Sequence, residues 1–336
     1  MDNRHLVLGG TGFLGAHLVL KLLEVNKRVS VLYRNEASQE KLKRIFSFYF
    51  SQYEVFYEKI EWIKGDITDV LSLDEVITEN DIVYHCAAHV SIDKVKSNDI
   101  HEINVEGTAN VVNICLDKNI NKLVYVSSVA AVGNVNNNSV ISEDGKWPVN
   151  SRGVYSTTKT KAEMEVWRGI AEGLTAVIVN PSVIVGPGEW SVGSPSFFQR
   201  VYDGLKMYSG GGTGFVDVHD VCRIMLALAD TDIENERFIL NGENLSYFDF
   251  LGLVAIALNK KAPTKFISNR KLNIAWKIAR ALSIIGIKPF ITKESALAAG
   301  RTKKYSSEKV CKFLNVSFKP IKTSVKETAE IFLKDY

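Results

Sequence analysis

The sequence predicts a doubly wound α/β fold, in which helices cover both faces of a parallel sheet, with a smaller helix-rich lobe toward the C-terminus. Two observations support this prediction. Short β-branched apolar runs alternate with longer helical stretches between residues 4 and 181, which is typical of β-α-β units. The first apolar run, residues 6–8, leads into a glycine-rich turn at 9–15, and a helix-like run follows it to residue 23.

Composition and charge are those of an ordinary globular protein. The 336 residues, at roughly 150 per domain, suggest about two domains. Hydrophobic residues make up 46%, and 41 basic against 38 acidic residues leave a net charge of +3, too balanced to indicate nucleic-acid binding. The four cysteines form no C-x-x-C pair, so we expect neither disulfides nor zinc, and a cytoplasmic location.

The glycine turn is the first candidate binding site. Gly9, Gly12 and Gly15 bring the backbone close to a ligand because no Cβ intervenes. The following helix points its free N–H groups and positive dipole end at the same place, which suits a phosphate. A tight packing turn is the alternative, but the strand before and the helix after favour a dinucleotide site.

The second strand, residues 28–34, indicates which dinucleotide is preferred. Folds that bind NAD usually place an acid at the end of this strand to bind the ribose hydroxyls, whereas this chain has Arg34. A guanidinium suits a 2′-phosphate, and Lys41 follows on a helical stretch at 38–50. We therefore favour NADP, with NAD as the alternative; the two cations could also be ordinary surface residues.

The third and fourth strands are expected at residues 60–67 and 81–88. Asp66 could accept a hydrogen bond from the adenine amino group while Ile67 packs on the ring, although a helix N-cap or a turn is the alternative role for Asp66. The fourth strand ends in small residues that would let a cofactor pass. His85 and His89 have no third metal ligand at a suitable spacing, so we expect packing or a hydrogen bond there and no metal site.

A second group of candidate residues follows the fifth strand. The elements here are a helix, a strand ending in two serines, a polar loop and a second helix, at residues 99–118, 122–128, 133–150 and 155–172. Tyr155 and Lys159 are four residues apart and therefore share one face of the second helix.

The glycine turn, the serine after the fifth strand and the Tyr-x-x-x-Lys pattern occur together. In this combination the chain resembles the short-chain dehydrogenase/reductase superfamily in its extended form, over about residues 4–247. Further landmarks match in order, namely Cys86-Ala87-Ala88, Asn104 and Asn180-Pro181-Ser182. The resemblance implies a Rossmann-type fold, and it is strongest to the dihydroflavonol reductase and 3β-hydroxysteroid dehydrogenase branch.

The resemblance also implies which residues contact the cofactor. They come from the glycine turn, the ends of the parallel strands and the helix that carries the tyrosine: Gly9, Thr11, Gly12, Phe13, Leu14, Gly15, Arg34, Lys41, Asp66, Ile67, Cys86, Ala87, Ala88, Asn104, Val126, Tyr155, Lys159, Pro181 and Val183. Of these, Pro181 would close the pocket beside the nicotinamide amide, and Lys159 would bind the nicotinamide ribose.

Three residues are expected to carry the chemistry. A free phenol has a pKa near ~10, and we expect Lys159 and an oxidised nicotinamide to lower the pKa of Tyr155 so that it exchanges protons as a general acid or base. Ser128 would hydrogen-bond the substrate oxygen. The choice of Ser128 over Ser127 rests on the family distance to Gly133.

The second half of the sequence is less regular. A sixth strand is expected at 175–179, a helix whose first residues are 215–221, and a further strand at 237–241. We assign residues 1–181 and 215–243 to the cofactor-binding domain, and residues 182–214 and 244–336 to a substrate-binding lobe.

The amphipathic stretch 271–287 in this lobe allows two interpretations. It could contact a membrane surface, or it could bury Trp276, Ile278 and Leu282 against the pocket or core, which is the commoner arrangement. Lys277 and Arg280 lie within its apolar run, which is short for a membrane span, so no integral membrane segment is expected.

Three functions are compatible with these residues. The first is an NADP-dependent oxidoreductase acting on a carbonyl/alcohol pair of an apolar or aromatic small molecule. The second is a nucleotide-sugar epimerase, disfavoured because residues 211–214 lack the expected arginine; residues 129–131 also lack the Asp-Glu pair of the 4,6-dehydratases. The third is a cofactor-binding regulator without turnover.

Family members often form homodimers through the helices that here carry Asn104 and Tyr155.

Overall fold

The computed structural model describes residues 3–89, 97–133, 140–145, 147, 153–284, 296 and 298–336. The polar loop expected at 133–150 lies largely outside this part of the chain.

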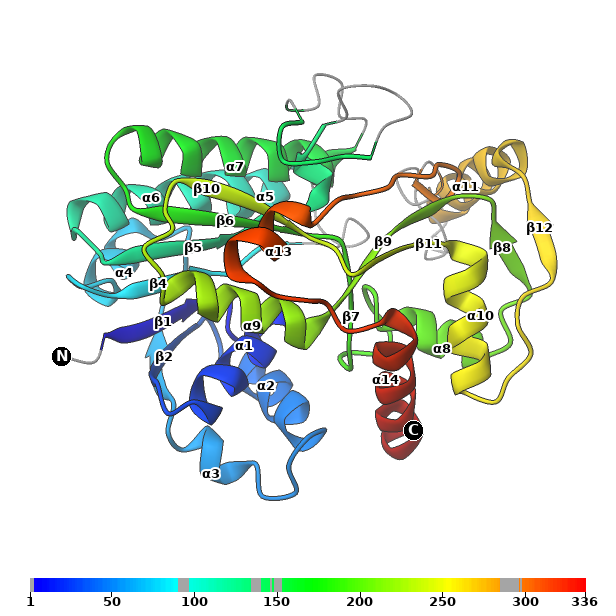
Figure 1. Cartoon of the computed structure of the whole chain (residues 1–336), viewed down its shortest axis with the longest axis horizontal. Coiled ribbons are helices and arrows are strands. Elements are labelled where there is room, and N and C mark those ends of the chain that lie inside the picture. The colour runs from blue at the N-terminus through cyan, green and yellow to red at the C-terminus, as the bar shows by residue number, and fades with distance from the viewer. Residues whose placement is uncertain are drawn as a thin grey trace.

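A seven-stranded sheet forms the centre of the larger body, and every neighbouring pair in it is parallel (Figure 1). Its strands, in spatial order, are β10 (Glu236–Leu240), β6 (Ala176–Pro181), β5 (Lys122–Val126), β4 (Ile82–His85), β1 (Arg4–Leu8), β2 (Arg28–Tyr33) and β3 (Glu61–Lys64). The strand order reverses between β1 and β4. Ligands of such sheets bind outside the carboxyl ends of the strands at this switch point.

Helices cover both faces of the sheet, which confirms the predicted doubly wound fold. One face carries α1 (Phe13–Glu24), α2 (Ala37–Ser47) and α9 (Val218–Ala229), and the other carries α4 (Val70–Val76), α6 (Gly107–Asp117) and α7 (Val154–Ala171). The side chains of β1 divide between them, with Val7 in one buried cluster and Leu6 and Leu8 in the other. Because both faces are buried, the strand reads as a continuous apolar run.

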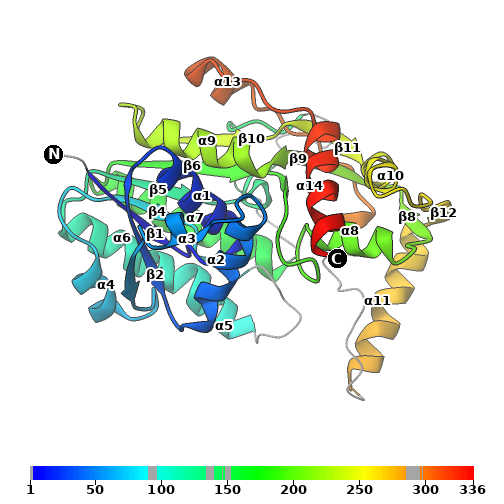
Figure 2. The same ribbon diagram turned by 90° about the horizontal axis from the view of Figure 1, so that it is seen from below.

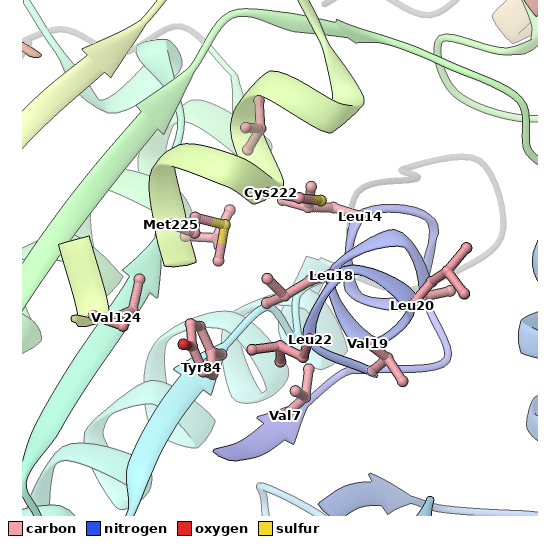
Figure 3. Close-up of a cluster of buried hydrophobic side chains, with 14 of the residues drawn as sticks. Val7, Leu14, Leu18, Val19, Leu20, Leu22, Tyr84, Val124, Cys222 and Met225 are labelled. Atoms are coloured by element: carbon pink, nitrogen blue, oxygen red, sulfur yellow. The ribbon is translucent and has the colours of Figure 1, made fainter. Parts of the chain in front are cut away.

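Helix α1 is the centre of the first of these layers. Figure 3 shows Leu18 and Leu22 pointing from α1 toward Tyr84 on β4 and Met225 on α9. All four side chains are 3% exposed or less. The helix is therefore packed between the sheet and a helix that lies about 200 residues later in the sequence.

The remaining elements form smaller sheets and a second helical group. A three-stranded sheet has the order β11 (Glu243–Ser246), β9 (Gly212–Asp217), β7 (Val183–Val185), and β8 (Met207–Ser209) pairs with β12 (Lys265–Ile267). The other helices are α3 (Glu54–Tyr57), α5 (Ser97–His101), α8 (Ser196–Tyr202), α10 (Tyr247–Ala257), α11 (Asn269–Ile284), α13 (Glu308–Leu314) and α14 (Ile321–Asp335), with short η1 (Glu102–Glu106) and η2 (Val129–Ala131).

A separate aromatic core holds α8, α10 and α14 together, at the right of Figure 1. Phe215 of β9 stacks on Phe250 of α10 with ring centres 4.1 Å apart, and Trp190 packs edge-on against Phe332 of α14. Offset and edge-on aromatic pairs of this kind stabilise a core beyond their buried area.

Two predicted helix boundaries were wrong. We expected residues 215–221 to begin a helix, but Phe215 to Asp217 complete strand β9 and the helix begins at Val218. Asp217 caps that helix, because its carboxylate accepts a hydrogen bond from the His219 backbone N–H at 2.8 Å. Helix α2 also ends earlier than expected, at Ser47.

The packing of α1 gives a prediction for stability. Leu18→Ala should lower the free energy of unfolding by about 2–5 kcal/mol, because it removes a fully buried side chain and leaves a cavity. Leu71→Ala on α4 is the matched control, since Leu71 is 77% exposed, and it should change stability by less than about 0.5 kcal/mol. Urea unfolding of both variants checks this; equal losses would show that α1 is not packed as described.

Candidate active site

The glycine turn joins β1 to α1 and lies against the chain that leaves β4. Gly9 has a φ of +82°, and a Cβ built on it would lie 2.5 Å from the Ala87 backbone nitrogen. A Cβ on Gly15 would lie 2.2 Å from the Gly9 carbonyl oxygen. Only glycine fits at these two positions. The turn and the small residues after β4 are therefore brought together, as the sequence suggested.

The N-terminus of α1 has the properties of an anion site. Gly12 is the N-cap residue, no side chain caps the helix, and the first turn contains no acidic residue. Among the residues that the structure describes, a Cβ on Gly12 would meet only the Gly9 carbonyl oxygen within 4 Å, so the space in front of the helix is open. Free N–H groups and the positive dipole end attract a phosphate there. These residues fit the pyrophosphate of a dinucleotide.

Two of the residues predicted to bind the adenosine end meet at the neighbouring ends of β2 and β3. Arg34 Nη1 lies 3.9 Å from Asp66 Oδ2, and the arginine side chain is 61% exposed. At this exposure the ion pair contributes little, so the guanidinium stays available to another anion. Lys41 is exposed on α2, in the next element along the chain.

Asp66 and Ile67 each contact neighbouring residues of the chain. Asp66 Oδ1 accepts hydrogen bonds from the backbone N–H and the hydroxyl of Thr68, each at 3.0 Å, so Asp66 stabilises a turn. Ile67 is buried and packs closely on Gly107, where an added Cβ would lie 2.8 Å from the Ile67 Cδ1. Neither contact prevents the predicted adenine interactions, which remain predictions.

Hydrogen bonds of Asn104 connect the segment after β4 to helix α7. The helix expected at 99–118 contains a π-turn, η1, and Asn104 lies within it; π-turns are frequent at functional sites. The Asn104 side chain accepts a hydrogen bond from the His89 N–H at 2.7 Å and donates to the His89 carbonyl at 3.1 Å and to the Thr158 hydroxyl at 3.3 Å. Thr158 immediately precedes Lys159. Asn104 thus positions both sides of the site.

The ring of His85 contacts a hydroxyl group. The buried ring of His85 has Nε2 3.0 Å from the Thr108 hydroxyl, which confirms the expected hydrogen bond. In the described part of the chain, no group of three or more His, Cys, Asp or Glu side chains could hold a metal ion.

The two serines after β5 face different surroundings. Ser127 is buried and donates to the Glu163 carboxylate at 2.5 Å. Ser128 is half-buried and lies near Tyr155, where it acts to lower the pKa of the phenol. The geometry therefore separates the two candidates, and Ser128 is the one beside the tyrosine.

Lys159 lies one turn after Tyr155 on α7 and is almost fully buried. Its Nζ donates to the Val126 carbonyl at 2.9 Å and lies 5.3 Å from the centre of the Tyr125 ring. The ammonium is thus held against the end of β5, next to Ser128. Pro181 and Val183 lie at the end of the neighbouring strand β6 and at the start of β7.

One protein-family model matches most of the chain. The NAD dependent epimerase/dehydratase family model covers residues 5–240, from β1 to the end of β10. The chain belongs to the NAD dependent epimerase/dehydratase family. It is accordingly an NAD(P)-dependent enzyme of the extended short-chain dehydrogenase/reductase type.

Individual family relatives support this assignment. A provisionally named dihydroflavonol 4-reductase from Synechocystis sp. is 27% identical over 342 residues, covering 99% of this chain and 95% of the relative. The decarboxylating sterol-4-alpha-carboxylate 3-dehydrogenase of Saccharomyces cerevisiae is 31% identical over 264 residues, covering 72% of each chain. The UDP-glucose 4-epimerase of Thermus thermophilus, solved with NAD, has the same fold, with a TM-score of 0.74, 20% identity and coverage of 99% and 100%.

Burial sets the protonation of Tyr155 and Lys159 in this family member. It raises the pKa of Tyr155 above its usual value, while the hydrogen bond with Ser128 opposes the increase. It lowers the pKa of Lys159 to about 8, against the influence of Cys86 and Glu163. In the protein alone, burial outweighs the other influences on the pKa of Tyr155; that Lys159 and an oxidised nicotinamide together lower this pKa remains a prediction. The phenol is therefore protonated at neutral pH and able to donate.

Sequence reasoning missed Glu163, which organises the protein behind the site. Its buried carboxylate accepts hydrogen bonds from Ser127 and from Asn180 Nδ2 at 2.7 Å, and pairs with Arg237 Nη1 at 3.1 Å. Ser127 directly follows β5, Asn180 lies on β6 and Arg237 lies on β10. The Glu163 side chain therefore connects three strands to α7. Its position four residues after Lys159 placed it on the same helix face and was the available signal.

The lowered pKa of Lys159 predicts how cofactor affinity depends on pH. The charged form is lost as pH rises through about 8, so NADPH affinity should be steady near pH 7 and fall above pH 8, by at most about tenfold per pH unit for one linked proton. Fluorescence titrations from pH 6.5 to 9.5 measure this. Lys159→Met should bind more weakly, without the decline above pH 8; the same decline in both proteins would assign it to another group.

Proposed function

We propose that this enzyme is an NADP-dependent reductase or dehydrogenase that interconverts the carbonyl and alcohol forms of an apolar or aromatic small molecule. The grouping of Ser128 beside Tyr155, with the buried Lys159 ammonium one helical turn away and held on the Val126 carbonyl, is the observation that carries the proposal. The names of the relatives, a dihydroflavonol reductase and a sterol dehydrogenase, support this class of substrate.

The roles of the three residues follow from their chemistry. The bound nicotinamide supplies or accepts the hydride. Ser128 and Tyr155 present two hydroxyls to one substrate oxygen, and Tyr155 Oη gives its proton to that oxygen as the carbonyl becomes an alcohol. Lys159 stabilises the phenolate that remains and, as the family resemblance implies, contacts the nicotinamide ribose. In the oxidative direction Tyr155 takes the proton back.

The proposal also assigns the two parts of the chain. Residues 1–181 and 215–243 hold the cofactor, with the pyrophosphate at the glycine turn and a 2′-phosphate at Arg34. Residues 182–214 and 244–336 form the substrate lobe. The open N-terminus of α1 and the largely exposed Arg34 guanidinium support this arrangement.

Two backbone contacts favour a nucleotide-sugar epimerase as the second candidate. The sequence around residues 211–214 lacks a cation, but the Gly212 N–H donates to the Arg301 carbonyl at 3.0 Å, and the Lys303 N–H donates to the Gly212 carbonyl at 3.1 Å. Two basic residues of the C-terminal part therefore lie beside this segment and offer charge to a diphosphate. Incubation with UDP-glucose and UDP-galactose distinguishes the candidates, since only an epimerase interconverts them without net cofactor turnover.

The proposed proton donor gives a prediction for turnover. Tyr155→Phe should lower the kcat for reduction of aromatic and alicyclic ketones with NADPH by at least ~10²-fold, because the general acid is lost. NADPH affinity should stay within about threefold of wild type, as one hydroxyl is removed. Steady-state assays and cofactor titrations measure the two effects separately.

The matched control removes an equivalent hydroxyl elsewhere. Tyr57→Phe deletes a half-buried hydroxyl that donates to Gln39 at 3.0 Å, and it should leave turnover unchanged. Near-normal ketone reduction by Tyr155→Phe would mean that the proton comes from another group.

Cofactor preference gives a separate prediction. NADPH should bind more tightly than NADH, and Arg34→Ala should remove about one to two orders of magnitude of that preference, since a charge-assisted contact contributes roughly 1.5–3 kcal/mol. Arg28→Ala is the control, because Arg28 is equally exposed at the opposite end of β2. Equal wild-type affinities for the two cofactors, or a preference that survives Arg34→Ala, would contradict the assignment.

A further inference from the structure

The charge of the chain is divided sharply along its length. Residues 1–246 carry 23 Lys and Arg against 32 Asp and Glu, a net charge of −9, whereas residues 247–336 carry 18 against 6, a net charge of +12. From Phe250 to Lys293 there are nine basic residues and no acidic one. The modest overall charge of +3 hides this asymmetry, which marks the C-terminal part as a surface for an anionic partner.

Helix α11 lies in the middle of this basic segment and has two different apolar sides. Leu272 and Ala279 are buried, at 5% and 0% exposure, and face the protein. Ile274 and Ile278 are 58% and 51% exposed on the opposite side. Burial of Ile278 against the core, one of the two interpretations of this stretch, was therefore wrong. Figure 2 shows α11 projecting beyond β8 and β12, away from the seven-stranded sheet.

Cations flank the exposed isoleucines on both sides. At 100° per residue, Arg270 and Lys277 lie on one side of the Ile274–Ile278 row and Lys271 lies on the other, and all three are exposed. Strand β12 runs directly into α11 and carries Phe266, which is 58% exposed. A surface helix normally presents polar residues to water, so the outward side of α11 is suited to a partner that is both apolar and anionic.

We propose that α11 docks this enzyme on the surface of an anionic lipid bilayer, with Ile274 and Ile278 inserted at the level of the headgroups and Arg270, Lys271 and Lys277 paired with lipid phosphates. This arrangement is that of an interfacial helix, which lies in the plane of the membrane and combines an apolar row with basic flanks. Within the part of the chain that the structure describes, no helix has the length and apolar character to cross a bilayer, so the contact is peripheral.

The exposed isoleucines favour lipid over nucleic acid. A protein that binds phosphates of DNA or RNA uses cations and, for single strands, aromatic side chains that stack on bases. Isolated aliphatic residues between cations gain nothing from a phosphate backbone in water. They gain by leaving water for the acyl boundary, which gives the lipid surface its additional affinity.

The test is flotation of the whole chain with two kinds of vesicle. One kind contains phosphatidylcholine alone, and the other contains phosphatidylcholine with roughly 30 mol% phosphatidylglycerol. Wild type should float with the anionic vesicles and not with the neutral ones. The double variant Ile274→Ser/Ile278→Ser, which keeps every cation, should bind about 100-fold more weakly, at roughly tenfold for each isoleucine. Lys271→Gln/Lys277→Gln should lose about 25-fold, at fivefold for each cation.

Controls keep the outcomes distinguishable. Leu71→Ser removes an aliphatic residue of α4 that is even more exposed, at 77%, and should float like wild type. Unchanged NADPH affinity and thermal unfolding in all variants would show that the fold is intact. Three results would overturn the proposal: no preference for anionic vesicles, binding that survives the isoleucine substitutions, or tighter binding to a DNA duplex that the isoleucine variant retains. A fourth result, salt-sensitive self-association seen by sedimentation without flotation, would also overturn it and would assign the basic surface to a second copy of the chain.

Discussion

The contact between the Gly9 turn and the backbone at Ala87 is the constraint on which the candidate site depends. At this point β1 and β4 are neighbours in the sheet although some 70 residues separate them in the chain, and a single added methyl group at Gly9 would collide with Ala87. The contact leaves the start of α1 open toward the carboxyl edge of the sheet. The predicted site residues at the ends of the neighbouring strands, Cys86, Val126 and Pro181, lie along this edge.

A buried polar network supports the same edge from behind. Glu163 connects α7 to the residues that follow β5 and to β6 and β10, while Asn104 connects α7 to the chain after β4. Lys159 lies between these two anchors, with its charge compensated by the Val126 carbonyl. Removing one partner of a buried ion pair is costly, so the network resists rearrangement. The positions of Ser128, Tyr155 and Lys159 are thus fixed by residues that themselves need no contact with a substrate.

Much of this arrangement could be predicted from local sequence. The strands, the glycine turn and the i,i+4 relation of Tyr155 and Lys159 depend on neighbouring residues, so their patterns survive in a single sequence. Features that depend on distant partners could not be predicted. The partners of Glu163 come from β10 as well as from the end of β5, and the pKa of Tyr155 depends on burial. Arg301 contacts Gly212 from about 90 residues away, and β9 ends at Asp217 because it pairs with β7.

The packing of α1 against α9 has a consequence for biosynthesis. During synthesis, the buried cluster around Leu18 and Leu22 can form only after residues 218–229 have left the ribosome, because α9 supplies the other side of this cluster. Until then the nascent chain carries an apolar helix face beside unpaired parallel strands, and parallel pairing is slow because its contacts are distant in sequence. The interval in which chaperones are needed should therefore close with the translation of α9 and β10, well before the C-terminal lobe is made.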